Sequence, residues 1–304
     1  MGPTASGKSD LAMRLSKEFN GEIIAVDSAT IYRFMDVGTA KPDKQTLEIT
    51  PHHLINIIDP DQSYSAHQFA LDAEKQIDEI VKRGKTPFLV GGTMLYFKSL
   101  LTGFNELPTA DAMLRKQIDE EALTVGWPAL HKRLMEVDET TALRLKENDS
   151  QRIQRALEVY QLTGRPLSSF HHEQKKNAWT GPVLSLALVP TQRKLLHQRI
   201  EARFMKMIEL GLENELRQLR IRFNLHSDLP SMRCVGYRQM WQYLNNEIDY
   251  ESMISSGIYA TRQLAKRQLT WLKSWPNLVS LDPFEQETER NMLIHVERFI
   301  SNHY

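Results

Sequence analysis

The chain has 304 residues, of which 41% are hydrophobic, and its 38 Lys and Arg balance its 38 Asp and Glu. This length and composition suit a globular protein with a sizeable core and more than one domain, and no apolar run approaches the roughly 18 residues of a membrane span. The single cysteine, Cys234, excludes an internal disulfide and a multi-cysteine zinc site, and the first residues show no secretion signal. We therefore expect a cytoplasmic monomer with no membrane partner.

The first hundred residues alternate between helix and strand patterns. Apolar residues at helical spacing predict helices over 10–19 and 65–83. Short apolar runs over 23–26 and 87–90 have the length and composition of buried strands. This alternation predicts a parallel α/β sheet.

The pattern changes near residue 109. Residues 109–123, 129–137 and 151–163 are charged and helical in period, and no strand run separates them. Strand composition returns over 184–189, and helices follow to about residue 273. We expect an α/β fold with a P-loop NTPase-like parallel-sheet core, residues 1–105 and 182–304, that ends in a group of helices and is interrupted by an all-helical insertion, residues 106–181.

A phosphate-binding motif opens the chain. The run from Gly2 to Ser9 matches G-x-x-x-x-G-K-[ST] in full, and an amphipathic helix follows it. Glycines allow successive backbone N–H groups to converge on a diphosphate at the positive end of that helix. Lys8 adds a point charge, and the hydroxyl of Ser9 can bind Mg²⁺. The predicted diphosphate contacts are Gly2, Thr4, Ala5, Ser6, Gly7, Lys8 and Ser9, with Ser9 as the metal ligand.

The phosphate loop normally follows a strand. Here the sequence begins at the loop, so we expect the first strand of the core to be missing.

Asp27 ends the first predicted strand, at the sheet edge where ligands of parallel α/β folds bind. Three interpretations of this carboxylate are open from the residues alone. It could bind Mg²⁺, as in small-molecule kinases, it could act as a base facing an acceptor, or it could cap a turn.

The charge balance hides an uneven distribution. Residues 193–273 carry 14 Lys and Arg against 8 Asp and Glu. Such a basic block can attract a polyanion, and it is equally typical of a solvated helical surface.

Several further stretches accompany the phosphate loop in a fixed order. They are Asp27-Ser28-Ala29-Thr30-Ile31-Tyr32, Met35-Asp36-Val37-Gly38-Thr39-Ala40-Lys41-Pro42, Pro51-His52-His53-Leu54, Gly91-Gly92-Thr93-Met94-Leu95-Tyr96, Arg233-Cys234-Val235-Gly236-Tyr237-Arg238 and Thr261-Arg262-Gln263-Leu264-Ala265-Lys266-Arg267-Gln268. Together they closely resemble the bacterial tRNA dimethylallyltransferase family, from Gly2 to about Trp275.

This resemblance implies transfer of a dimethylallyl group from dimethylallyl diphosphate to N6 of adenosine 37, beside the tRNA anticodon, assisted by Mg²⁺. It implies Asp27 as general base and Arg203 as a second catalytic residue that holds the diphosphate. The implied tRNA contacts are Asp27, Ser28, Ala29, Thr30, Thr93, Arg115, Gln151, Arg152, Ile153, Gln154, Arg155, Arg233, Cys234, Val235, Gly236, Tyr237, Arg238, Lys266, Arg267, Gln268 and Lys273.

The sequence departs from the family pattern at Thr30, Phe34 and Ser9, and it has no cysteines for the zinc finger of eukaryotic members. Three other functions stay open at this point. They are a P-loop kinase that uses ATP, an enzyme that prenylates free adenine nucleotides, and a non-catalytic RNA-binding protein.

Overall fold

A computed structural model describes residues 1–171 and 177–303. The chain divides into two compact units: unit 1 is Met1–Leu101 with Trp179–Tyr304, and unit 2 is Thr102–Ala178. The sequence predicts a helical insertion over residues 106–181, a range that differs from that of unit 2 by a few residues at each end. It includes residues 172–176, which are outside the described part of the chain.

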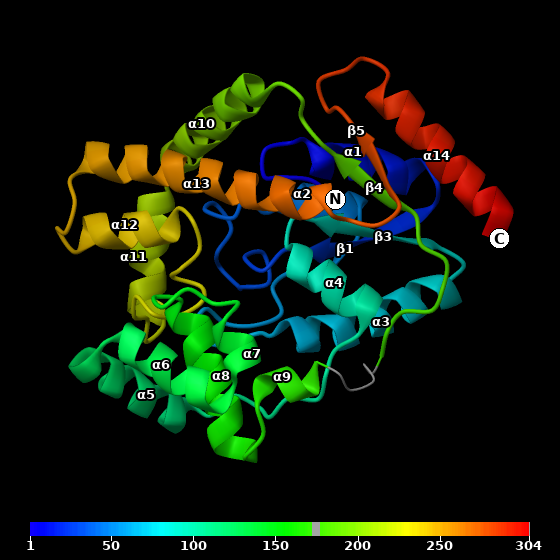
Figure 1. Cartoon of the computed structure of the whole chain (residues 1–304). Helices are drawn as coiled ribbons and strands as arrows, with labels where there is room; N and C mark the ends of the chain where they lie inside the picture. The colour runs from blue at the N-terminus through cyan, green and yellow to red at the C-terminus, as the bar shows by residue number, and fades with distance from the viewer. Residues whose placement is uncertain (172–176, 304) are drawn as a thin grey trace. The chain divides into compact units, whose positions relative to one another are not determined.

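Unit 1 alternates helices and strands and then continues with long helices (Figure 1). Its elements are α1 (Lys8–Glu18), β1 (Gly21–Val26), α2 (Lys44–Ile49), β2 (His52–His53), α3 (Ala66–Lys82), β3 (Thr86–Gly91), α4 (Met94–Thr102), β4 (Ser185–Leu188), α10 (Arg193–Glu209), α11 (Leu212–Arg222), α12 (Tyr237–Leu244), α13 (Tyr250–Lys273), β5 (Leu278–Leu281) and α14 (Thr288–His303). The predicted α/β class with parallel strands and many helices is confirmed.

Three parallel strands form the sheet that positions the site. They lie in the order β2-β1-β3, with Ile23 of β1 opposite Phe88 of β3 and Val26 opposite Gly91. The side chain of Val26 is fully buried, as expected for a strand covered on both faces. Because β1 and β3 are parallel and in register, Asp27 and Gly92 leave the sheet at the same edge.

A second, two-stranded parallel sheet pairs β4 with β5. Met1 lies against β4: its amino group donates to the carbonyl of Leu186 at 2.7 Å, and the N–H of Leu188 donates to the carbonyl of Met1 at 3.0 Å. Residues of β3 and β4 also line an apolar cavity of about 330 Å³, which Leu11 and Leu15 of α1 help to enclose. The phosphate loop therefore begins at the edge of β4.

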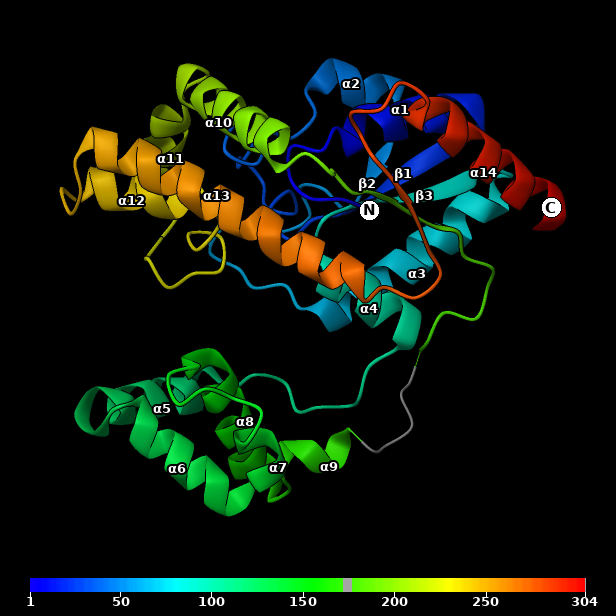
Figure 2. The ribbon, with the colours of Figure 1, turned by 45° about the horizontal axis from the view of Figure 1, so that its top comes forward.

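Helices α10, α11, α12 and α13 share one apolar core. Phe204 of α10, Leu216 of α11, Met240 of α12 and Met253 of α13 are all buried in it. Figure 2 shows α10 and α13 running past one another. This packing holds α13 beside the sheet edge where Asp27 lies.

The elements of unit 2 within its described residues are helices. It consists of α5 (Ala112–Val125), α6 (Trp127–Val137), α7 (Glu139–Ala142), α8 (Ser150–Thr163) and α9 (Leu167–Phe170). Ile118, Leu130, Leu134 and Ile153 form its core. Across the described residues of both units, no helix combines the length and the apolar character needed to cross a membrane.

Candidate active site

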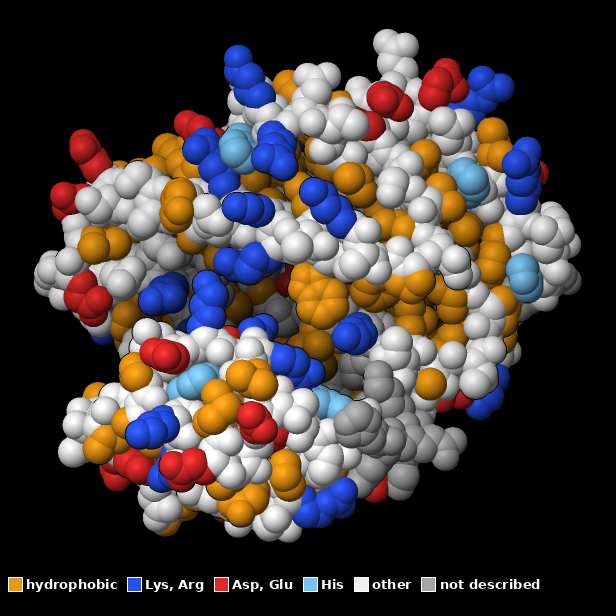
Figure 3. Space-filling model, viewed as in Figure 1, with side chains coloured by type: hydrophobic (Ala, Val, Ile, Leu, Met, Phe, Trp, Pro, Cys, Tyr) orange, Lys and Arg blue, Asp and Glu red, His pale blue; other side chains and the backbone are white. Residues whose placement is uncertain are grey.

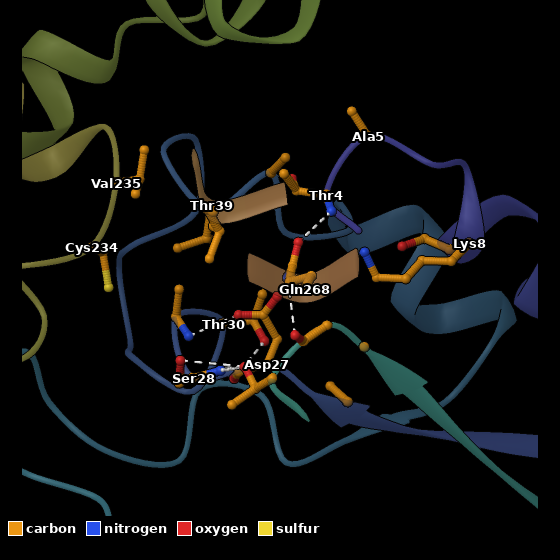
Figure 4. Close-up of a pocket in the computed structure, with 18 of the residues that line it drawn as sticks. Thr4, Ala5, Lys8, Asp27, Ser28, Thr30, Thr39, Cys234, Val235 and Gln268 are labelled. Atoms are coloured by element: carbon orange, nitrogen blue, oxygen red, sulfur yellow. Dashed lines mark hydrogen bonds between the residues drawn. The ribbon is translucent and has the colours of Figure 1, made fainter. Parts of the chain in front are cut away.

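One pocket of about 540 Å³ lies in unit 1, where the phosphate loop meets the carboxyl edge of the sheet (Figure 4). Its lining includes the phosphate loop, the ends of β1 and β3, the segments 38–42 and 230–235, and helices α10 and α13. The pocket thus joins segments from the beginning, the middle and the end of the chain.

The phosphate loop turns sharply before α1. Gly7 has φ of 86°, a left-handed conformation that glycine adopts without steric cost, and the helix begins at the next residue. The ammonium group of Lys8 donates to the carbonyl of Pro3 at 3.1 Å, so it lies back over the loop. Burial lowers the pKa of Lys8 to about 8, while Asp27 raises it and Arg203 lowers it further. The loop therefore carries a half-buried cation, which suits it to bind an anion.

The side of the pocket opposite the loop is formed by Asp27 and its neighbours. The Oδ1 atom of Asp27 accepts the N–H of Ala29 at 2.9 Å, which fixes the carboxylate at the end of β1. The N–H of Ser28 donates to Thr93 Oγ1 at 3.0 Å, and the N–H of Thr93 donates to the carbonyl of Val26 at 3.2 Å. These bonds tie the residues after β1 to those after β3.

Arg203 extends from α10 into the same pocket. Its Nη2 donates to the carbonyl of Thr39 at 3.3 Å, and its Nε is buried with no hydrogen-bond partner among the described residues. Burial lowers the pKa of Arg203, and the charge of Asp27 opposes that shift. A buried guanidinium with an unused donor is an electrostatic cost that a bound anion would relieve.

The segment 36–39 is held in place by one carboxylate. Glu215 of α11 accepts the N–H groups of Asp36 and Val37 at 2.7 Å each and that of Gly38 at 3.0 Å. The hydroxyl of Tyr237 donates to the same carboxylate at 2.5 Å. With the segment 36–39 held in this way, the carbonyl of Thr39 lies where Arg203 can donate to it.

Glu215, Thr39, Leu95 and Trp271 are not among the site residues predicted from the sequence. The last three line the pocket, and the side chains of Leu95 and Trp271 are exposed there. The motif from Met35 to Pro42 was a signal for Thr39. Nothing in the sequence pattern connects Glu215 with that motif, since they are far apart along the chain.

The predicted tRNA contacts of unit 1 fall into three groups. Those that line the pocket are Asp27, Ser28, Ala29, Thr30, Thr93, Arg233, Cys234, Val235, Arg267 and Gln268. Arg238, Lys266 and Lys273 are exposed on α12 and α13. Gly236 and Tyr237 are buried, and the hydroxyl of Tyr237 donates to Glu215; contact of these two residues with tRNA stays a prediction.

The remaining predicted contacts lie in unit 2, on α5 and α8. Arg115 and Arg155 both donate to Glu158, a fully buried carboxylate, and thereby stabilise the unit. Ile153 is buried in the core of unit 2, and its contact with tRNA stays a prediction. The other predicted contacts on α8 either bond within unit 2 or are exposed. Gln154 donates to Asp119 at 2.7 Å, Arg152 pairs with Asp149 at 2.8 Å, and Gln151 is exposed.

Comparisons with known proteins agree over nearly the whole chain. A family model described as IPP transferase matches residues 30–275. A curated tRNA dimethylallyltransferase of Nitrosomonas europaea is 52% identical over 303 residues, 99% of this chain and 96% of that protein. The chain belongs to the IPP transferase family. This confirms the resemblance predicted from the sequence.

Solved structures support the same placement within the IPP transferase family. A tRNA isopentenylpyrophosphate transferase of Bacillus halodurans is 34% identical with a TM-score of 0.69, and the match covers 99% of this chain and 94% of that one. A eukaryotic dimethylallyltransferase acting on tRNA is 27% identical with a TM-score of 0.82, covering 100% of this chain and 79% of that one. The similarity therefore includes both units of the IPP transferase chain.

Proposed function

We propose that this protein transfers the dimethylallyl group of dimethylallyl diphosphate to N6 of adenosine 37 in tRNA and releases diphosphate. The observation that carries the proposal is that Lys8, Arg203 and Asp27 line the same pocket. Cations for a leaving diphosphate and a carboxylate for an incoming amine are thereby brought together. The names of the relatives support the substrate class, and the P-loop motif supports a P-loop NTPase-like core.

The donor half of the reaction breaks the bond between the allylic carbon and the diphosphate oxygen. Positive charge spreads over the allyl group while negative charge grows on the leaving diphosphate, so preorganised donors and cations on the diphosphate lower the barrier. Backbone N–H groups of the phosphate loop, the Lys8 ammonium and the Arg203 guanidinium would supply them. The planar fork of Arg203 can hold two phosphate oxygens together.

The acceptor half forms the bond between N6 and the allylic carbon. The amine is a poor nucleophile, so Asp27 would orient it and accept its proton as the bond forms. Holding the amine against the allylic carbon contributes a large part of the rate. The adenine must leave the stack of the anticodon loop to reach Asp27.

Mg²⁺ fits the donor set of the pocket. The hydroxyl of Ser9 lines it, and this oxygen ligand is of the kind that Mg²⁺ prefers together with substrate phosphates. No cluster of three or more His, Cys, Asp or Glu side chains that could hold a metal occurs among residues 1–171 and 177–303. A bound Mg²⁺ would neutralise charge on the diphosphate, with Ser9 as its protein ligand.

The RNA would meet exposed basic side chains around the pocket. Figure 3 shows Lys and Arg side chains gathered over α10 and α13. Arg233 and Arg267 line the pocket, and Lys266 and Lys273 continue along α13. We place the tRNA backbone on these residues, and we retain a monomeric state and a cytoplasmic location as parts of the proposal.

The test is transfer of labelled dimethylallyl diphosphate, run in parallel with unmodified tRNA, with free AMP, and with ATP in the absence of RNA. We expect label in tRNA alone. Label in AMP would assign the protein to nucleotide prenylation, and ATP consumption without RNA would assign it to a kinase. No transfer to any acceptor would contradict the proposed reaction.

A further inference from the structure

Gln268 is a buried amide near the C-terminal end of α13, and both ends of that amide are bonded. Its Oε1 accepts the N–H of Thr4 at 2.8 Å, and its Nε2 donates to the carbonyl of Gly92 at 3.0 Å. The side chain is only 8% exposed. Figure 4 shows it between the phosphate loop and the residues around Asp27.

The two bonds join the two halves of the pocket. Thr4 belongs to the phosphate loop, and Gly92 lies in the turn after β3, one residue before Thr93. Thr93 in turn receives the N–H of Ser28, beside Asp27. A continuous path of hydrogen bonds and backbone therefore runs from the phosphate loop through Gln268 to the residue that follows the proposed base.

Only a glycine permits this approach at position 92. A Cβ there would come within 2.2 Å of Gln268 Nε2 and 3.1 Å of the carbonyl of Gly2. The phosphate loop, the turn after β3 and the amide of Gln268 are thus packed in direct contact, with no room for another side chain.

We infer that Gln268 is a positioning residue, which sets the phosphate loop at a fixed separation from the Asp27 side of the pocket, and that its side chain does not read RNA. The inference deepens the proposed function and rests on it for the meaning of the site. A side chain whose donor and acceptor are both engaged inside the protein has little left to offer a base. Its neighbours Lys266 and Arg267 are exposed and keep their charges available to RNA.

The informative change is Gln268→Glu, because it preserves the shape of the side chain. The ionised carboxylate can still accept the N–H of Thr4, but it cannot donate to the carbonyl of Gly92 and repels that oxygen. Protonation restores the missing donor. Gln268→Met gives similar length with no donor at any pH, and Gln218→Glu, on the exposed face of α11, controls for the added charge.

The experiment measures the affinity of each variant for inorganic diphosphate with Mg²⁺ and for unmodified tRNA, at pH 8 and at pH 5, beside the melting temperature. We expect Gln268→Glu and Gln268→Met to bind diphosphate about ten-fold more weakly at pH 8, since one buried hydrogen bond contributes on this order. Their affinity for tRNA should match that of the unchanged protein. At pH 5 the diphosphate affinity of Gln268→Glu, relative to the unchanged protein, should recover, and that of Gln268→Met should not.

Other results would overturn the inference. A loss of tRNA affinity with unchanged diphosphate affinity would make Gln268 an RNA contact. A lower melting temperature with both affinities unchanged would make it a purely structural residue. Because the diphosphate measurement needs no acceptor, absence of transfer to tRNA by the unchanged protein would contradict the proposed function separately from this inference.

Discussion

Asp27 and Lys8 face one pocket although they come from different elements, one at the end of β1 and the other at the start of α1. The carboxylate is oriented by the N–H of Ala29, while the ammonium is turned back to the carbonyl of Pro3. At the scale of single residues, the site is therefore held by backbone groups close in sequence to each functional side chain.

Replacing Asp27 by Asn tests the role of this carboxylate as a base. The amide is isosteric and can still accept the N–H of Ala29, but it has almost no basicity. We expect transfer to tRNA to fall by about 10²-fold or more, the lower range for loss of a general base, with tRNA affinity unchanged. The measurement is single-turnover transfer beside equilibrium tRNA binding, and unchanged transfer would remove Asp27 as the base.

The lowered pKa of Lys8 predicts a pH dependence of donor binding. Lys8 has a pKa of about 8 in the folded chain, against its ordinary value of 10.5. Between these two pH values the folded protein binds fewer protons than the unfolded chain, so the free energy of unfolding rises with pH across that window. A bound diphosphate favours the charged form. Affinity for dimethylallyl diphosphate should therefore fall above pH 8, by up to about ten-fold per pH unit.

Calorimetric titration with dimethylallyl diphosphate, in two buffers of different ionisation enthalpy, would detect the associated proton uptake. Lys8→Arg is the matched control, because a guanidinium stays charged throughout this range and should remove the pH dependence. A donor affinity that is flat from pH 7 to 10 in the unchanged protein would contradict the prediction.

At the scale of elements, α13 has two distinct faces. Ile258, Ala265 and Leu272 are buried in the core, as their spacing predicts. The cations of α13 differ in their surroundings: Arg262 pairs with Glu201 of α10 at 3.0 Å, whereas Lys266 and Lys273 are exposed. Helical periodicity indicates on which face of α13 a residue lies. Packing against α10 decides which cation of α13 forms an ion pair.

The positions of β3 and β4 indicate that an extension of the chain before Met1 would stabilise the fold. Both strands line the apolar cavity, and Met1 already makes two hydrogen bonds to β4. Five apolar, β-forming residues placed before Met1 could continue this pairing and bury several side chains, each worth about 1.5–3 kcal/mol. We expect the melting temperature to rise by roughly 5–10 °C.

The matched control for this extension is a sequence of the same length in which prolines replace alternate residues, since proline cannot donate to a strand ladder. Thermal unfolding of the two versions should differ. An equal melting temperature for both, without gain over the unchanged chain, would mean that the core closes without this strand.

At the scale of the whole molecule, charge is balanced overall and uneven locally. Exposed cations on α13 accompany a pocket that contains Lys8 and Arg203. Replacing Lys266 and Lys273 together by Gln should weaken tRNA binding and make its salt dependence shallower by about 1.4 in log–log slope, because each phosphate contact on single-stranded RNA contributes about 0.7. The KM for dimethylallyl diphosphate should not change.

The control for that pair is Lys17→Gln with Lys82→Gln, which removes two exposed charges from α1 and α3 outside the pocket lining. Filter binding of tRNA at several salt concentrations gives the slopes. Equal slopes for the two double variants would show that α13 has no special contact with the RNA backbone.

Local sequence is enough for the α/β class and the phosphate loop, because each depends on residues that are near one another in the chain, and the family follows from motifs spread along it. The turn at Gly7, the helix after it and the buried run before Asp27 follow from local propensity and apolar spacing. The catalytic roles predicted for Asp27 and Arg203 rest on the family resemblance and not on a geometry that the sequence reveals.

Which polar groups meet depends on tertiary packing. Glu215 holds the segment 36–39, Gln268 bridges Thr4 and Gly92, and the buried Tyr237 donates its hydroxyl to Glu215. Each of these pairings joins residues that are distant in sequence, and local pattern does not encode which of many polar side chains will be buried together. Burial then fixes the partners, since an unpaired polar group inside the protein is costly.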